Sequence, residues 1–211
     1  MSNAIAGTRR ALLLTLALLL PAGAAQAQTT AAPAPDVFIL ELSTEVLNTV
    51  KSDKAIQAGD VARVVALVDT KVMPHVNFQR MTASAVGRHW RTATPEQQQR
   101  LQDEFKLLLV RTYAGALAQV KDQSIALKPL RANPTDNEVV VRTEIKGRGE
   151  PIQLDYRMER SGSGWKVYDF NVLGIWLVEQ YRSSFAQEIT ASGIDGLITK
   201  LAERNKSASK A

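Results

Sequence analysis

The chain has 211 residues, of which 45% are hydrophobic and 22% are charged, and its formal net charge is +5. This composition is typical of a folded globular protein and excludes the collagen-like and intrinsically disordered classes. The chain has no cysteine, which excludes disulfides, thiolate metal sites and cysteine nucleophiles. Its two histidines, His75 and His89, are too few to build a histidine metal centre. We therefore expect no bound metal and no cofactor.

The N-terminus has the pattern of a secretory signal peptide. Arg9 and Arg10 precede an apolar run over residues 11–20, and Ala25-Gln26-Ala27 is a small-x-small cleavage site. The apolar run of about ten residues is too short to span a bilayer, which needs ~20 residues. We therefore predict that residues 1–27 are a cleaved signal peptide and that the protein is exported. Loss of the two arginines lowers the formal net charge from +5 to +3.

The first half of the remaining chain carries apolar side chains at helical spacing. This spacing predicts four helices, which begin near Asp36, Val61, Asn77 and Thr94. The last of them has the strongest start signal, because Thr94 can cap it, Pro95 fits its first position and Gln97 completes a capping box. From Leu101 to Val120 this helix carries one broad apolar face.

The second half changes to the alternating pattern of β-strands. Strands are predicted over residues 124–130, 138–146, 152–159 and 165–172. The short connections between them predict that consecutive strands are antiparallel neighbours. Helical spacing returns from Leu177 and is interrupted at Gly193. The sequence thus predicts an α+β fold in which an antiparallel sheet of about four strands packs against several helices.

The domain organisation follows from these patterns. We expect a single domain over residues 36–204, because no internal repeat or linker divides this range. Residues 28–35, rich in Ala, Thr and Pro, are predicted to be a flexible N-terminus of the mature protein. The small and polar residues 205–211 are predicted to be a disordered tail.

Several motifs resemble the MlaC, or toluene-tolerance, family. The first half contains Gly87-Arg88-His89-Trp90, followed by Thr94-Pro95-Glu96-Gln97. The second half contains Trp165-Lys166-Val167-Tyr168-Asp169 and, further along, Tyr181-Arg182. These motifs occur in the order and spacing of the family, and the resemblance covers residues 36–204.

The resemblance implies a periplasmic phospholipid carrier. In this family a twisted antiparallel sheet and the surrounding helices enclose the acyl chains of the lipid. The implied partners are an outer-membrane lipoprotein–porin complex and the MCE-domain subunit of an inner-membrane ABC transporter, and the implied role is to maintain outer-membrane lipid asymmetry. We expect a monomer. One departure is that Leu173 and Trp176 stand where many members have an acidic residue and a serine around Gly174.

A carrier of this kind needs apolar side chains that face a cavity. Two acyl chains of about 16 carbons require ~25 kcal/mol of shielding, at ~0.8 kcal/mol per methylene, which a surface groove cannot supply. For each apolar side chain a role in the core is the simpler interpretation. As candidates for the acyl-chain pocket we select inward-facing residues from both halves of the chain: Phe105, Leu109, Tyr113, Val141, Leu154, Tyr156, Val167, Phe170 and Leu177.

Two other functions stay open at this point. Asp169 could be the general base of an enzyme with an apolar pocket, but without a second carboxylate or a histidine at an interpretable spacing a structural role is simpler. An adaptor or chaperone for outer-membrane proteins would present an exposed apolar groove and enclose no lipid. Nucleic acid is a poor partner for an exported protein with a net charge of +3 and no concentrated basic and aromatic surface. We expect no enzymatic activity and no catalytic residue.

Overall fold

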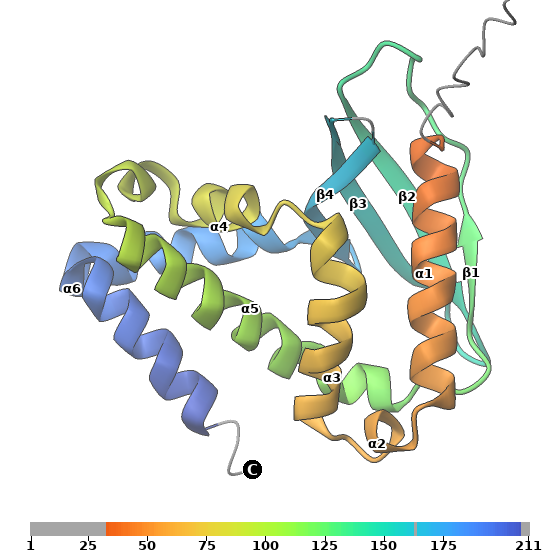
Figure 1. The fold of residues 1–211 in the computed structure, drawn as a ribbon, viewed down its shortest axis with the longest axis horizontal. Helices are drawn as coiled ribbons and strands as arrows, with labels where there is room; N and C mark the ends of the chain where they lie inside the picture. The colour runs from red at the N-terminus through yellow and green to blue at the C-terminus, as the bar shows by residue number, and fades with distance from the viewer. Residues whose placement is uncertain (1–32, 163, 208–211) are drawn as a thin grey trace, which may run out of the picture. The chain divides into compact units, whose positions relative to one another are not determined.

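The computed structural model describes residues 33–162 and 164–207. The predicted signal peptide, residues 1–27, lies outside the described residues, as do residues 28–32. The described residues belong to one compact unit and form a five-stranded antiparallel sheet packed with helices (Figure 1). The predicted α+β class is confirmed, with five strands where about four were expected.

The helices begin where the sequence places their caps. The helical elements are α1 (Pro35–Ser52), α2 (Lys54–Gln57), α3 (Val61–Leu67), η1 (Val68–Val72), η2 (Met73–His75), α4 (Phe78–Val86), η3 (Gly87–Thr92), α5 (Pro95–Ala118) and α6 (Leu177–Ser207). The capping box of α5 is present, since Thr94 Oγ1 accepts the Gln97 N–H at 3.2 Å and Gln97 Oε1 accepts the Thr94 N–H at 3.0 Å. Asn77 caps α4 by accepting the N–H of Arg80 at 3.0 Å.

The strands follow one another in the sheet, each antiparallel to the next. They are β1 (Ser124–Leu127), β2 (Glu138–Lys146), β3 (Ile152–Ser161), β4 (Gly164–Val172) and β5 (Ile175–Trp176). The sequence does not predict β5, because two residues are too few to show an alternating pattern. β4 contains a bulge: Met158 of β3 pairs with Val167 and Arg157 pairs with Asp169, which leaves Tyr168 as an extra residue.

The helices divide into two groups around the sheet. α1 packs along β1 and β2, whereas α4, α5 and α6 pack against one another, and α4 and α6 also contact β4 (Figure 1). A larger cluster of buried apolar side chains joins the sheet to α4, α5 and α6 around Phe105 and Met158. A smaller cluster joins α1, α2, α3 and the end of α5 around Val50, Ile56 and Val64. The fold therefore has two apolar centres that meet along α5.

The two ends of the predicted domain need correction. Pro35, expected in a flexible segment, is the buried first residue of α1. Asn205, expected to begin a disordered tail, is buried within α6, where its Nδ2 donates to the backbone oxygen of Glu104 at 3.0 Å. The polar composition hides this contact because it depends on α5, which is distant in the sequence. Gly193 interrupts α6 as predicted, with a φ of 73°. Residues 208–211 lie outside the described residues.

Candidate functional site

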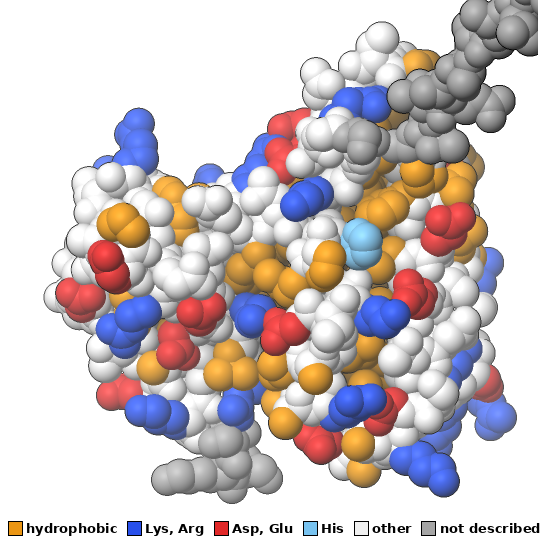
Figure 2. Space-filling model, viewed as in Figure 1, with side chains coloured by type: hydrophobic (Ala, Val, Ile, Leu, Met, Phe, Trp, Pro, Cys, Tyr) orange, Lys and Arg blue, Asp and Glu red, His pale blue; other side chains and the backbone are white. Residues whose placement is uncertain are grey.

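A cavity of about 560 Å³ lies where the two apolar clusters meet. Val64 and Val110 of its wall belong to the smaller cluster, whereas Val76 and Leu177 belong to the larger one. Its volume falls within the range of ~300–1,000 Å³ that is typical of small-molecule sites. Hydrophobic side chains are visible in the hollow between α3 and α5 (Figure 2). The chain thus leaves a space at the position where a continuous core would otherwise form.

A row of valines lines the cavity on the helical side. Val64 lies on α3, and Val68 and Val72 follow at intervals of four residues on η1. η1 is a π-helical turn, in which the Met73 N–H bonds to the Val68 carbonyl five residues earlier. Valine side chains are short, so they leave the space between this segment and α5 open.

The sheet supplies the opposite wall. Leu154 of β3 pairs with Val172 of β4, and both line the cavity because directly paired residues share one face of a sheet. Val167 and Phe170 are three residues apart and would lie on opposite faces of a regular strand. The bulge at Tyr168 brings both of them to the same face, as their partners Met158 and Tyr156 show. The bulge therefore extends the apolar wall along β4.

A second cavity of about 180 Å³ lies between α1 and the sheet. It shares six lining residues with the larger cavity: Val72, Val76, Leu117, Ile145, Leu154 and Phe170. Its wall also carries a polar pair, because the Ser43 hydroxyl on α1 and the Tyr156 hydroxyl on β3 lie 3.0 Å apart. Burial raises the pKa of Tyr156, so its phenol stays protonated at neutral pH. The two cavities are neighbours with a shared apolar wall.

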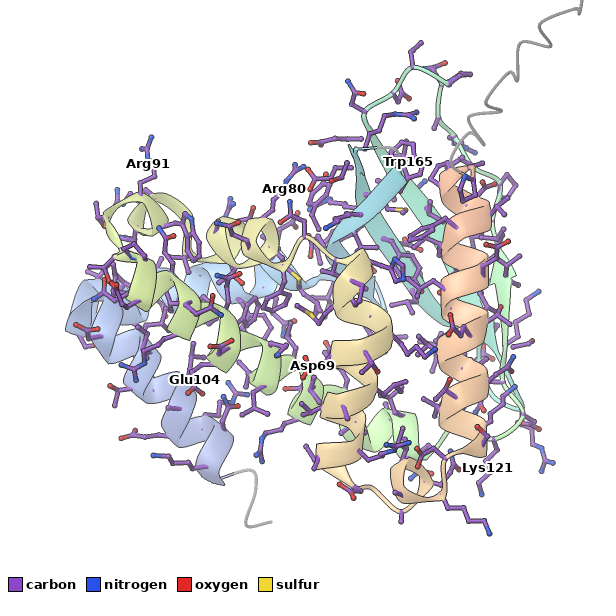
Figure 3. All side chains as sticks on the ribbon, in the orientation of Figure 1. Asp69, Arg80, Arg91, Glu104, Lys121 and Trp165 are labelled. Atoms are coloured by element: carbon purple, nitrogen blue, oxygen red, sulfur yellow. The ribbon has the colours of Figure 1, made fainter. Side chains whose placement is uncertain are left out.

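The larger cavity has few polar lining residues. They are Lys106, Gln119 and Gln123. Lys106 Nζ forms an ion pair with Asp69 Oδ1 at 2.7 Å, and Figure 3 shows Asp69 between α3 and α5. Gln119 and the apolar Ile152 are both exposed to solvent, so the cavity reaches the surface near the end of α5. The site combines an apolar wall with a few polar side chains.

Asp169 does not line either cavity, and its carboxylate accepts hydrogen bonds from neighbouring groups of the fold. Its Oδ1 accepts the backbone N–H groups of Phe170 at 2.9 Å and Val178 at 3.1 Å, and its Oδ2 accepts from Arg157 Nη1 at 3.1 Å. Burial raises the pKa of Asp169, while these hydrogen bonds and the Arg157 charge act in the opposite direction. The carboxylate joins β4 to the start of α6.

The described part of the chain has neither a candidate metal centre nor a membrane-spanning helix. Among residues 33–162 and 164–207, no group of three His, Asp or Glu side chains could hold a metal ion. No helix within these ranges is long and apolar enough to cross a membrane. The two apolar cavities are the candidate functional site.

Comparison with known proteins identifies relatives of this architecture. The family model described as MlaC protein matches residues 40–203. The chain belongs to the MlaC family. The toluene tolerance protein ttg2D of Pseudomonas putida is 28% identical over 168 residues, which cover 79% of this chain and 78% of that protein. The intermembrane phospholipid transport system binding protein MlaC of Haemophilus influenzae is 23% identical over 171 residues, which cover 79% of this chain and 80% of that protein.

A solved structure resembles this MlaC-family chain closely. It is the phospholipid-binding protein of Ralstonia solanacearum in complex with a phospholipid. The two chains are 47% identical, and their TM-score is 0.82. The match covers 84% of this chain and 99% of the other.

Most of the residues predicted for an acyl-chain pocket line a cavity in this MlaC-family fold. The larger cavity is lined by Leu109, Tyr113, Leu154, Phe170 and Leu177. The smaller cavity is lined by Tyr156 and Val167, together with Leu154 and Phe170.

Two predicted residues, Phe105 and Val141, line neither cavity. Phe105 is fully buried and makes edge contacts with Tyr181 and Phe185 of α6, because it lies on the side of α5 that packs against α6. Val141 is buried in the closed part of the core, where it pairs with Tyr156.

The sequence reasoning missed the contribution of the segment before α4. Val64, Val68 and Val72 face the cavity, although their spacing predicts only an amphipathic helix packed on a core. Local spacing cannot distinguish a side chain that meets another side chain from one that meets a void.

Proposed function

We propose that this chain is a periplasmic carrier of glycerophospholipid within the Mla transport system. It would enclose the acyl chains and pass the lipid between the outer-membrane lipoprotein–porin complex and the MCE-domain subunit of the inner-membrane ABC transporter. The predicted signal peptide over residues 1–27 would export it. Such transfer would maintain the lipid asymmetry of the outer membrane.

The apolar cavity, which opens to the surface near the end of α5, is the observation that carries this proposal. Exposure of an acyl chain to water costs ~0.8 kcal/mol of free energy per methylene. A carrier must therefore surround the chains with apolar side chains. The cavity of about 560 Å³ and its neighbour of about 180 Å³ offer an almost wholly apolar wall that surrounds part of this space. The relative from Ralstonia solanacearum, 47% identical, was solved with a phospholipid bound.

We propose the cavity-lining residues as the acyl-chain contacts. They are the seven predicted residues Leu109, Tyr113, Leu154, Tyr156, Val167, Phe170 and Leu177, together with the row Val64, Val68 and Val72. The opening beside Gln119, near the end of α5, is the proposed place for the lipid's polar end, because a charged headgroup loses least hydration there.

The transfer needs no covalent chemistry. A lipid is shielded both in a membrane and in the cavity, so its exchange between the two is close to balanced in free energy. Asp169, the candidate general base, faces Arg157 and two backbone N–H groups and lies outside the cavities. We therefore propose a binding protein and not an enzyme.

The test is the lipid content of the purified full-length chain. Organic extraction and native mass spectrometry should detect bound phospholipid. Leu154→Trp, which places an indole in the wall shared by both cavities, should reduce the bound lipid several-fold. Val37→Trp is the matched control, because Val37 is 42% exposed on α1 and lines neither cavity.

A protein that carries no phospholipid and accepts none from vesicles would overturn the proposal. Equal lipid content in the parent and in a folded Leu154→Trp variant would overturn the assignment of the cavity. An adaptor or chaperone would give the first of these results and would still bind its protein partner.

A further inference from the structure

The turn between β4 and β5 contains a leucine in an unfavourable backbone conformation. Val172 pairs with Ile175, so Leu173 and Gly174 form a two-residue turn. Their φ angles are 54° and 88°, the positive pair that a type I′ turn requires. Asn-Gly or Gly-Gly is typical of such a turn, because a left-handed conformation costs most L-residues roughly 1–2 kcal/mol. Leu173 is the only non-glycine residue with positive φ in the described ranges.

The same leucine is exposed. Leu173 is 65% exposed, Ile175 is 52% exposed and Ile152 is 41% exposed. Among the described residues only one other large hydrophobic side chain, Val37, is exposed to this degree. Exposed aliphatic side chains are therefore concentrated at one end of the sheet. We call Ile152, Leu173 and Ile175 the apolar rim.

The apolar rim continues the wall of the larger cavity. Ile152 and Val172 line that cavity, and Ile175 shares a sheet face with Val172 because the two residues pair directly. The Leu173 N–H donates to the carbonyl of Gln153 at 3.0 Å, which holds the turn beside the start of β3. Ile152, which both lines the cavity and is exposed, therefore connects the cavity wall to the exposed side chains of the rim.

We propose that the apolar rim contacts the surface of a lipid bilayer directly and provides the path by which acyl chains enter the cavity. This inference rests on the proposed function as a phospholipid carrier. The chain would then take up phospholipid from a membrane that contains no protein.

The size of the rim favours a bilayer over a protein partner. A specific protein interface buries ~800 Å² per partner around a central anchor, which three aliphatic side chains do not provide. Partial insertion into the headgroup region requires no shape complementarity. Full burial of one such side chain contributes at most ~1.5–3 kcal/mol, so three partly exposed ones provide weak and reversible binding. A carrier must leave the membrane again, and weak binding permits this.

The charges beside the rim permit binding to a membrane but do not dominate it. Lys146 is the last residue of β2, and Arg148 and Glu150 belong to the connection that leads from β2 to Ile152. Arg148 Nε forms an ion pair with Asp122 Oδ2 at 3.0 Å, and Lys121, labelled in Figure 3, lies between α5 and β1. Three basic and two acidic side chains leave a small positive excess. We therefore expect binding to neutral vesicles, with a modest increase on anionic ones.

The experiment measures vesicle binding and lipid uptake by the full-length chain. Vesicles of phosphatidylcholine alone, and vesicles that also contain phosphatidylglycerol, are mixed with protein depleted of lipid. Co-flotation reports binding, and transfer of a fluorescent phospholipid reports uptake. The test variant combines Leu173→Asn with Ile175→Thr, which keep the turn and strand preferences and remove the aliphatic side chains. The control is Val37→Thr, which removes an aliphatic side chain that is 42% exposed on α1, away from the rim.

We expect the test variant to lose co-flotation and to take up lipid roughly tenfold more slowly, a factor that corresponds to about 1.4 kcal/mol. The Val37→Thr control should match the parent protein. The lipid content of the test variant as purified should also match the parent, because its cavity wall is unchanged.

Unchanged uptake by the test variant would overturn the inference. Failure of the parent protein to take up lipid from either kind of protein-free vesicle would also overturn it. Failure of the proposed function would look different, since the parent protein would then contain no phospholipid as purified.

Discussion

The hydroxyl groups of Ser43 and Tyr156 lie 3.0 Å apart, although the two residues are 113 positions apart in the chain. Ser43 belongs to α1 and Tyr156 to β3, and both line the smaller cavity. The contact therefore ties α1 to the sheet across a wall that is otherwise apolar. Since Tyr156 is buried, its hydroxyl would lack this partner if α1 moved away.

Removal of this hydrogen bond should weaken the attachment of α1. We expect Tyr156→Phe to lower the free energy of unfolding by about 1 kcal/mol, which is typical of a buried hydrogen bond. Urea unfolding of Tyr156→Phe, Ser43→Ala and the double variant gives the coupling energy between the two hydroxyls. Additive effects of the two substitutions would show that the pair contributes nothing to stability.

Two leucines on α5 should respond differently to truncation. Leu101 is fully buried in the packed core, so Leu101→Ala should lower the free energy of unfolding by ~2–5 kcal/mol. Leu109 already faces the larger cavity, and Leu109→Ala should cost the lipid-free protein less, about 1 kcal/mol, because fewer contacts are lost. Urea unfolding of both variants after lipid removal measures the difference. Equal losses would indicate that the cavity closes in the absence of lipid.

Leu173→Asn should stabilise the fold while it removes an aliphatic side chain. Asparagine adopts positive φ more readily than leucine, so we expect the free energy of unfolding to rise by about 0.5–1 kcal/mol. Thermal unfolding measures this change, and Gly174→Ala is the opposite control because it adds a Cβ where φ is 88°. A loss of stability in Leu173→Asn would mean that the leucine packs more favourably than its exposure indicates.

Acid should weaken the contact between α4 and the start of β2. Arg80 Nη2 pairs with Glu138 Oε1 at 2.7 Å, and this hydrogen bond lowers the pKa of Glu138 below its ordinary 4.5, with a further contribution from Tyr168. At acidic pH the unfolded chain therefore binds more protons at this site than the folded protein does. The stability from this site is present above pH 4.5 and is lost as the pH falls through the lowered pKa.

Glu138→Gln should reduce this pH dependence slightly, since the Glu138 side chain is 54% exposed and its ion pair is screened by solvent. Urea unfolding at neutral pH and at about pH 3.5 measures the slope. Glu150→Gln, at another exposed glutamate, is the control. If the free energy of unfolding depended on pH equally in Glu138→Gln and in the parent, the ion pair would not contribute to the acid sensitivity.

The sequence by itself determined the local elements. The capping box at Thr94 and Gln97 predicts the start of α5, and the predicted strand over residues 138–146 has the bounds of β2 in the structure. These signals are local, because a cap involves residues three positions apart and an alternating face needs only a few residues in one strand. The α+β class followed from the order of such signals along the chain.

Only the tertiary structure decided which apolar residues face a cavity. Leu109 and Phe105 belong to one apolar face of α5, yet Leu109 lines the larger cavity and Phe105 packs against α6. Val167 and Phe170 share a sheet face because of the bulge at Tyr168, which no alternating pattern predicts. The cavity exists because the apolar faces of α3, α5 and the sheet do not pack directly against one another. How far apart these elements lie depends on contacts between parts of the chain that are distant in the sequence. The spacing of apolar residues predicts which side chains avoid water, but it does not predict whether each one packs against another side chain or faces a cavity.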